Sequence, residues 1–224
     1  MSAILFDMDG TLVDSEPLWL EAECEVMESV GASWSAQDQL STLGGPRERN
    51  EKIMQEKSNN VKPYGFFGDQ LDILMLKKLQ TQLQILPNAL DLINECRNFG
   101  LKIALVTASG GQLMRTVLTH FPINFFDVTI SADDVERSKP DPAPYLLAAD
   151  RLGVKIEDCV VVEDSITGVT AGLSSGAQVI GIPHLVSLPD HENLRIVNTL
   201  AELSVTKLVD WYPFLNQVKV RNHG

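Results

Sequence analysis

Short apolar runs rich in valine and isoleucine recur along the chain and hardly alternate with polar residues. They are Ala3–Phe6, Lys102–Val106, Val128–Ile130, Cys159–Val162 and Gln178–Ile182. Most of these runs are too short for helices, and a continuous apolar run is typical of a strand that is buried on both faces. The pattern therefore predicts a central parallel sheet.

Amphipathic segments of helical length separate these runs in the second part of the chain. Asn88–Phe99 ends before Gly100, Gly111–His120 ends before Pro122, and Pro142–Leu152 follows Asp141 and ends before Gly153. Glycine or proline after a helix and aspartate before one are common boundary residues. Strands that alternate with helices indicate an α/β fold, with a doubly wound parallel sheet in a Rossmann-like core.

One segment, from Glu16 to about Leu86, lacks strand-like runs. Its apolar spacing instead predicts helices, over Pro17–Val30, Ser35–Leu43, Arg47–Lys57 and Gly68–Leu83. We therefore expect a catalytic core formed by residues 1–14 and 86–224, with an all-α cap domain inserted at 15–85. Open α/β sheets bind ligands beyond the carboxyl ends of their strands, so a cap inserted there would act as a lid.

The charge balance is acidic, with 18 lysines and arginines against 30 aspartates and glutamates and a net charge of −12. This balance argues against binding to nucleic acid or to an anionic membrane surface. No apolar stretch approaches the ~20 residues of a membrane span, and no basic segment precedes the first apolar run, as it would in a signal peptide. Cys24, Cys96 and Cys159 are widely spaced and fit reduced thiols. We expect a cytoplasmic monomer.

The residues that follow the predicted strands include carboxylates, a hydroxyl group, a lysine and glycines. They are Asp7 and Asp9 after the first strand, Thr107–Gly111 after the second, Lys139 near the third, and Glu163 and Asp164 after the fourth. Because the carboxyl ends of parallel strands meet at one edge, we expect these groups to lie together. An aspartate at a strand end is often only a helix cap, but reactive groups after four successive strands favour a site.

This combination fits phosphoryl transfer through an aspartate. A carboxylate that attacks phosphorus splits one difficult step into two easier ones. Asp7 and Asp164 offer oxygen ligands that suit Mg²⁺, and the cation would remove the repulsion between neighbouring carboxylates. Asp9 lies two residues after Asp7, on the same side of an extended backbone, where it can exchange protons with the leaving oxygen and the attacking water.

A phosphate-binding region is predicted beside these carboxylates. Thr107 and the backbone N–H groups of Ala108 and Ser109 follow a strand and precede a helix, which is a common anion cradle. Lys139 would supply positive charge to the phosphoryl oxygens. The expected partner is therefore a small phosphorylated metabolite.

Four segments of the chain resemble, in order, the four motifs of the haloacid dehalogenase-like superfamily. They are Asp7-Met8-Asp9-Gly10-Thr11, Thr107-Ala108-Ser109, Lys139-Pro140 and Val162-Glu163-Asp164-Ser165. The helical insertion resembles the cap of subclass I. The stretches DSEPLW and SKPDPAPY resemble the branch of the sugar-phosphate phosphatases and β-phosphoglucomutase. The resemblance extends to about Ile182.

The resemblance implies a role for each motif. Asp7 would be the nucleophile and Asp9 the general acid and base, while Thr107 and Lys139 would bind phosphate. The Mg²⁺ ligands would be Asp7, Asp164 and the backbone carbonyl of Asp9, with Glu163 assisting.

Departures from the relatives' patterns separate the possible activities. Dehalogenases lack the second aspartate, and phosphonatases use a lysine in the first cap helix, whereas Glu16–Gly31 contains no lysine or arginine. Mutases of the β-phosphoglucomutase type carry a cap-loop lysine and a cap histidine, but this loop reads Leu43-Gly44-Gly45-Pro46-Arg47 and the helix offers Trp19. We predict a Mg²⁺-dependent phosphatase that hydrolyses a small sugar or polyol monophosphate through an aspartyl phosphate. A phosphosugar mutase is the alternative.

Three cap residues are candidates for substrate contact: Trp19, Arg47 and Arg49. Trp19 fits either the core of the cap or a sugar-stacking platform. The arginines fit either a solvated first helical turn or a substrate contact. Two further hypotheses are a catalytically idle binding protein and a response-regulator-like receiver. The reactive residues kept in all four motifs argue against the first, and the helical insertion argues against the second.

Overall fold

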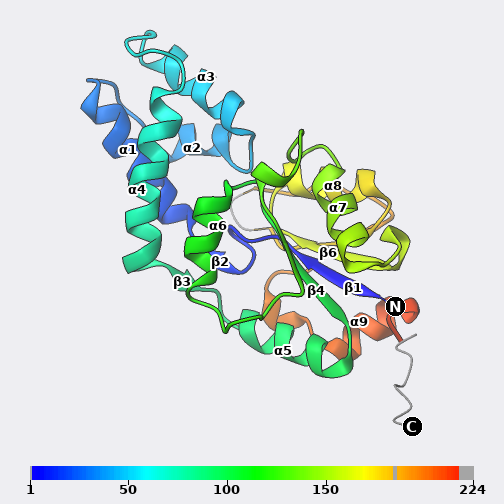
Figure 1. Ribbon diagram of the computed structural model, residues 1–224. Coiled ribbons are helices and arrows are strands. Elements are labelled where there is room, and N and C mark those ends of the chain that lie inside the picture. The colour runs from blue at the N-terminus through cyan, green and yellow to red at the C-terminus, as the bar shows by residue number, and fades with distance from the viewer. Residues whose placement is uncertain (1, 184–185, 217–224) are drawn as a thin grey trace.

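The computed structural model describes residues 2–183 and 186–216 (Figure 1). Within these residues, six strands form one parallel sheet in the order β5-β4-β1-β6-β7-β8. The strands are β1 (Ala3–Phe6), β4 (Lys102–Val106), β5 (Val128–Ile130), β6 (Cys159–Glu163), β7 (Gln178–Gly181) and β8 (Leu194–Ile196). The predicted α/β fold with a doubly wound parallel sheet is confirmed.

Helices cover both faces of this sheet, as the alternation within β1 demonstrates. Ile4 and Phe6 belong to one hydrophobic cluster, with α5 (Ala89–Phe99), α6 (Gly111–Leu118) and α9 (Val205–Trp211). Ala3 and Leu5 belong to a second cluster, with α7 (Ala143–Leu152) and α8 (Ile166–Ser175). All four β1 side chains are fully buried. A strand buried on both faces has no polar alternation, which explains why the apolar runs identified the strands.

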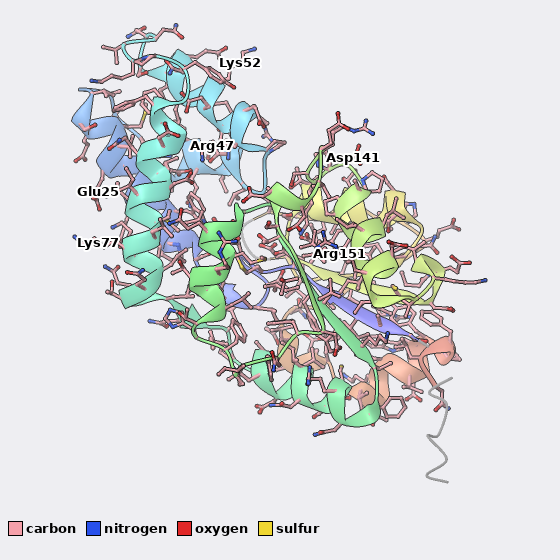
Figure 2. The ribbon with its side chains drawn as sticks, viewed as in Figure 1. Glu25, Arg47, Lys52, Lys77, Asp141 and Arg151 are labelled. Atoms are coloured by element: carbon pink, nitrogen blue, oxygen red, sulfur yellow. The ribbon has the colours of Figure 1, made fainter. Side chains whose placement is uncertain are left out.

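The segment after β1 forms a helical cap beside the sheet (Figure 1). Its helices are α1 (Glu16–Ser29), α2 (Ala36–Thr42), α3 (Arg47–Lys57) and α4 (Phe66–Gln82). The charged residues Lys52 and Lys77 lie at the outer surface of these helices (Figure 2). Helix α4 begins before the expected Gly68 because the Glu51 carboxylate accepts hydrogen bonds from the backbone N–H groups of Gly65 and Gly68, each at 2.8 Å.

Several elements differ from the sequence predictions. An antiparallel pair of β2 (Val13–Asp14) and β3 (Gln84–Ile85) joins the two chain crossings between core and cap, where no strand was expected. Helix α6 ends at Leu118 instead of His120. Strand β8 and helix α9 were not predicted. Short 3-10 helices span Ala132–Asp134, Ile156–Asp158, Leu200–Glu202 and Pro213–Asn216. Among the described helices, none has the length and apolar character needed to cross a membrane.

The carboxyl ends of β1, β4 and β6 lie at the same level of the sheet, and this alignment positions the site. Phe6 pairs with Leu105 on one side and with Val162 on the other. The backbone N–H of Asp7 continues this register by donating to the carbonyl oxygen of Val162 at 2.9 Å. The residues after β1, β4 and β6 therefore emerge together at the carboxyl edge of the sheet.

Candidate active site

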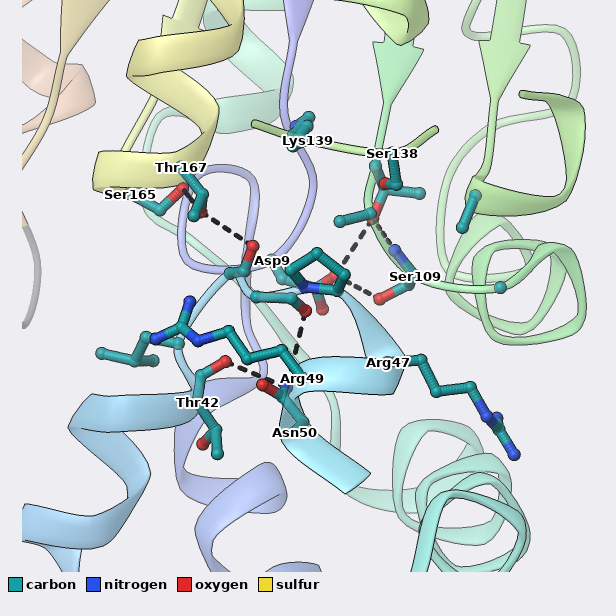
Figure 3. Close-up of a pocket in the computed structure, with 18 of the residues that line it drawn as sticks. Asp9, Thr42, Arg47, Arg49, Asn50, Ser109, Ser138, Lys139, Ser165 and Thr167 are labelled. Carbon is teal, nitrogen blue, oxygen red and sulfur yellow. Dashed lines mark hydrogen bonds between the residues drawn. The ribbon is translucent and has the colours of Figure 1, made fainter. Parts of the chain in front are cut away.

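A cavity of about 1270 Å³ opens at this edge, between the core and the cap (Figure 3). All the core residues expected at the site line it except Glu163: Asp7, Asp9, Thr107, Ala108, Ser109, Lys139 and Asp164. The cap contributes the opposite wall, including Glu16, Trp19, Glu23, Gln39, Thr42, Arg47 and Arg49. The topology thus brings the strand-end residues into one cavity that is covered by cap residues.

Lys139 lies at the base of the cavity and is only 2% exposed. Its Nζ atom donates to Oδ1 of Asp7 at 2.5 Å, to Oε1 of Glu163 at 2.7 Å and to the carbonyl oxygen of Val106 at 2.8 Å. Three acceptors satisfy the three donors of an ammonium group. Burial lowers the pKa of Lys139, but the charges of Asp7 and Glu163 outweigh this effect and raise it. The lysine is therefore held as a cation against Asp7.

Glu163 is fully buried and organises its neighbours rather than facing the cavity. Its Oε1 atom also accepts from the Tyr145 hydroxyl at 2.8 Å, and its Oε2 atom accepts from the backbone N–H groups of Asp164 at 3.0 Å and Ser165 at 3.1 Å. The Nζ atom of Lys139 lies 4.9 Å from the centre of the Tyr145 ring. Tyr145 was not a candidate from the sequence, because its position on the inner face of α7 is decided only by packing.

Asp7, Glu163 and Asp164 form a buried acidic cluster, with one oxygen of each lying within 4.8 Å of the others. Burial, followed by the charge of Glu163, raises the pKa of Asp7 to about 8. Burial and the charge of Asp7 likewise raise the pKa of Asp164. Gly10 has a φ of +76°, and a Cβ atom there would lie 2.1 Å from Oδ2 of Asp164. Glycine therefore lets the loop after β1 close onto the cluster.

Asp9 is held by three hydroxyl groups. Its Oδ1 atom accepts from Ser15 at 2.6 Å, and its Oδ2 atom accepts from Ser109 at 2.8 Å and from Thr107 at 3.3 Å. Ser15 lies at the entry to the cap and was not singled out in the sequence. Among the described residues, Asp9 has no cationic partner and is fixed by these hydrogen bonds, which suits a group that exchanges protons.

The loop after β4 leads into α6, and two of its backbone N–H groups are hydrogen-bonded within the core. Thr107 is buried, and its Oγ1 atom accepts from the backbone N–H of Ser109 at 2.9 Å. Ala108 lies between these two residues, and α6 begins at Gly111, where the Asp133 carboxylate accepts from the backbone N–H at 2.9 Å. The loop is thus braced by its own hydroxyl group and by one aspartate.

The cap candidates have different environments. Trp19 lines the cavity and also packs against the larger hydrophobic cluster. Arg47 forms ion pairs with Asp69 at 2.6 Å and with Asp72, and its guanidinium points away from Asp9 (Figure 3). Arg49 donates to the carbonyl oxygen of Ser41. The structure therefore brings Trp19 to the cavity wall, while the charge of Arg47 is balanced within the cap.

Glu16 is a further cavity residue that the sequence did not single out. Burial, and next the charge of Asp9, raise the pKa of Glu16 to about 8. Its backbone carbonyl accepts from Nε2 of Gln39 at 2.8 Å. The cap wall therefore offers carboxyl and amide groups, which can hydrogen-bond to hydroxyl groups of a ligand.

Comparison with known proteins identifies relatives over most of the chain. The family model described as haloacid dehalogenase-like hydrolase matches residues 4–182. Hexitol phosphatase B of Escherichia coli (strain K12) is 33% identical over 184 residues, which are 81% of this chain and 83% of that protein. The phosphorylated carbohydrates phosphatase of Thermotoga maritima is 31% identical over 203 residues, 90% of this chain and 93% of that protein.

Solved structures agree with these sequence matches. A protein from Thermotoga maritima described as a putative β-phosphoglucomutase is 30% identical, with a TM-score of 0.72, and the match covers 93% of this chain and 100% of that chain. CbbY from Rhodobacter sphaeroides in complex with phosphate is 26% identical, with a TM-score of 0.81, over 93% of this chain and 99% of that chain. As its sequence motifs predict, the chain is an enzyme of the haloacid dehalogenase-like hydrolase family, in the branch of the sugar-phosphate phosphatases and β-phosphoglucomutase-like proteins.

Proposed function

We propose that this enzyme hydrolyses a small sugar or polyol monophosphate through a phosphorylated Asp7. The observation that carries the proposal is the juxtaposition of a buried Asp7–Lys139 pair with Asp9 at the floor of a covered cavity. The names of relatives such as hexitol phosphatase B support the substrate class.

The reaction divides into two steps that use the same residues. A carboxylate oxygen of Asp7 attacks phosphorus, the bond from phosphorus to the leaving oxygen breaks, and Asp9 gives a proton to that oxygen. Asp9 then takes a proton from water, and the water oxygen attacks the phosphorus of the aspartyl phosphate. The bond between phosphorus and the Asp7 oxygen breaks, which restores the Asp7 carboxylate and releases inorganic phosphate. The phosphoryl oxygens are stabilised by the positive charge of Lys139 and by hydrogen bonds from Thr107 and from the backbone N–H groups of Ala108 and Ser109.

The acidic cluster fits a magnesium ion. Asp7 and Asp164 are hard oxygen donors whose buried charges need a cation, and the lack of a side chain at Gly10 lets the loop after β1 pack against Asp164. Asp7, Asp164 and the backbone carbonyl of Asp9 would hold the ion. Both oxygens of Glu163 already accept several hydrogen bonds, so Glu163 would assist by fixing Lys139 and Asp164. When bound, Mg²⁺ shields the anionic substrate from the anionic nucleophile.

The cap favours a phosphatase over a mutase. A mutase needs a second anion site to hold a bisphosphate in both orientations. Within the described cap residues, Arg47 is neutralised by Asp69 and Asp72, and the first cap helix carries no basic residue. Among the described cap residues this leaves Arg49 as the cation that lines the cavity and could meet a second phosphate, while Arg137 of the core, which also lines it, is 77% exposed and paired with Asp141. Water would then compete effectively for the phosphorylated Asp7.

The deciding assay incubates the enzyme and Mg²⁺ with β-glucose 1-phosphate and a trace of glucose 1,6-bisphosphate, and follows free phosphate and glucose 6-phosphate. Hexitol phosphates are assayed in parallel for release of phosphate. We expect phosphate release and little glucose 6-phosphate. Fast formation of glucose 6-phosphate with little free phosphate would establish the mutase instead.

A further inference from the structure

The loop between α2 and α3, called here the cap loop (residues 43–46), touches the first turn of α8 in the core. The Thr167 hydroxyl donates to the carbonyl oxygen of Gly44 at 2.7 Å (Figure 3). These residues are 123 positions apart in the chain and belong to opposite walls of the cavity. One hydroxyl group therefore ties the cap loop directly to the catalytic core.

The cap loop is shaped for this close approach. Gly44 has a φ of +57°, and a Cβ atom at this position would lie 2.4 Å from Oγ1 of Thr167 and 3.1 Å from Cβ of Ser165. Any side chain at residue 44 would be strained by its backbone angle and would collide with the core. Within the glycine pair that stands where mutases carry a lysine, Gly44 therefore allows the cap loop to contact the core.

The contact also lies next to the hydrogen bonds that fix the catalytic floor. Oγ1 of Thr167 is 3.4 Å from Oγ of Ser165, which in turn lies 3.1 Å from Oε2 of Glu163. The other oxygen of Glu163 holds Lys139. A cap loop held by Thr167 is therefore connected, through Ser165 and Glu163, to the residues that hold the nucleophile.

We propose that Thr167 is a positioning residue that fixes the cap loop over the organic part of the substrate, a role that rests on the proposed function. The cap loop and the adjoining Thr42 form part of the cavity wall opposite the loop that follows β4 (residues 107–110). A phosphate ester with a large, hydroxylated leaving group reaches this wall. A very small phosphate such as acetyl phosphate is held by the core alone and does not depend on the wall.

The test compares Thr167→Val with Thr116→Val. Valine keeps the shape of threonine but removes the hydroxyl. Thr116, on α6 of the core, does not line the cavity, and its hydroxyl donates to the carbonyl oxygen of Gln112 in its own helix at 3.0 Å. For Thr167→Val we expect kcat/KM on a hexitol phosphate to fall by about three- to tenfold, the scale of one neutral hydrogen bond. Acetyl phosphate hydrolysis should change less than twofold, and Thr116→Val should affect neither substrate. Equal losses on both substrates for Thr167→Val would overturn the proposal.

A second variant checks that the effect passes through Gly44. Gly44→Ala should displace the cap loop and reproduce the selective loss, and adding Thr167→Val to it should cause little further loss, because both changes break one contact. Fully additive losses in the double variant would contradict the proposed contact.

Amide hydrogen exchange of residues 42–50 gives a readout that does not depend on activity. Exchange should be faster in Thr167→Val than in the unmodified enzyme, and unchanged in Thr116→Val. Unchanged exchange in Thr167→Val would refute the docking role even in an inactive protein. If the unmodified enzyme hydrolyses neither phosphate, the proposed function fails, while the exchange result still decides whether Thr167 holds the loop.

Discussion

The Nζ atom of Lys139 lies 2.7 Å from Oε1 of Glu163, and both side chains are buried beneath the cavity. Lys139 bridges this carboxylate to Asp7, so a single cation is shared by two buried carboxyl groups. Removing one partner of a buried ion pair leaves an uncompensated buried charge. The stability of the core and the position of the nucleophile Asp7 therefore depend on the same lysine.

Lys139→Met should abolish most of the activity and should also lower the free energy of unfolding by about 3–5 kcal/mol in metal-free buffer. Urea unfolding in EDTA measures the second effect. Lys155→Met is the matched control, since Lys155 is 77% exposed and lies 3.8 Å from Glu157, an arrangement that contributes about 0–1 kcal/mol. Similar losses in the two variants would contradict the buried-pair interpretation.

Asp7→Asn should reduce turnover by at least ~10³-fold, because it removes the charge that attacks phosphorus and one metal ligand. Steady-state assays on purified, folded protein check this expectation. Asp150→Asn serves as the control, since Asp150 is exposed on α7 and outside the cavity. Retention of more than about a tenth of the original turnover by Asp7→Asn would remove Asp7 as the nucleophile.

Asp9→Ala should slow hydrolysis of an alkyl phosphate far more than that of an aryl phosphate. An alkoxide leaves poorly unless it is protonated, whereas a phenolate leaves without much help. The ratio of kcat values on the two substrates measures the difference, and Ser15→Ala, which removes one hydrogen bond to Asp9, should show a weaker form of it. Equal losses on both substrates in Asp9→Ala would argue against a general acid.

Several of these residues could be predicted from the sequence because they follow strands that are buried on both faces. The runs Ala3–Phe6 and Lys102–Val106 coincide with β1 and β4, and the carboxyl ends of parallel strands must meet. Strand β8 escaped prediction because it has only three residues and Arg195 interrupts their apolar pattern, while both Arg195 and Ile196 are exposed. An edge strand with an exposed face does not carry the signature of a buried one.

Side-chain partners were less accessible to prediction, because they depend on packing between distant elements. Arg47 stands beside the cap loop in sequence, but the packing of α3 on α4 places Asp69 and Asp72 against it. Tyr145 reaches Glu163 only because α7 covers one face of the sheet. Neither relationship leaves a periodic pattern in the sequence.

Mg²⁺ should stabilise the folded enzyme, and Asp164→Asn should remove most of this stabilisation. A ligand that binds only the folded state at about ten times its dissociation constant raises the free energy of unfolding by about 1.4 kcal/mol. Urea unfolding with EDTA and with Mg²⁺ measures the difference. Asp158→Asn is the control, because Asp158 precedes the first residue of β6 and so lies at the end of the strand away from Asp164. This variant should respond to Mg²⁺ like the unmodified protein. A normal Mg²⁺ response in Asp164→Asn would exclude Asp164 as a ligand.

The buried carboxyl group of Glu23 predicts a pH-dependent stability of the cap. Burial raises the pKa of Glu23 from 4.5 to about 7, although hydrogen bonds from Trp34 at 2.8 Å and Thr42 at 3.1 Å oppose the shift. The folded state therefore binds the proton more tightly than the unfolded chain. This contribution is complete below about pH 4.5 and is lost as the pH rises through about 7.

Glu23→Gln keeps the size of the side chain but cannot ionise. Between pH 5 and pH 8 the unmodified protein should therefore lose stability relative to the variant, as measured by the free energy of unfolding. The change should reach at most about 3 kcal/mol, since each pKa unit corresponds to about 1.4 kcal/mol. Urea unfolding at both pH values measures it. Glu28→Gln, an exposed change on the same helix, should show no such trend. A pH-independent difference for Glu23→Gln would mean that Glu23 ionises as readily in the folded cap as in the unfolded chain.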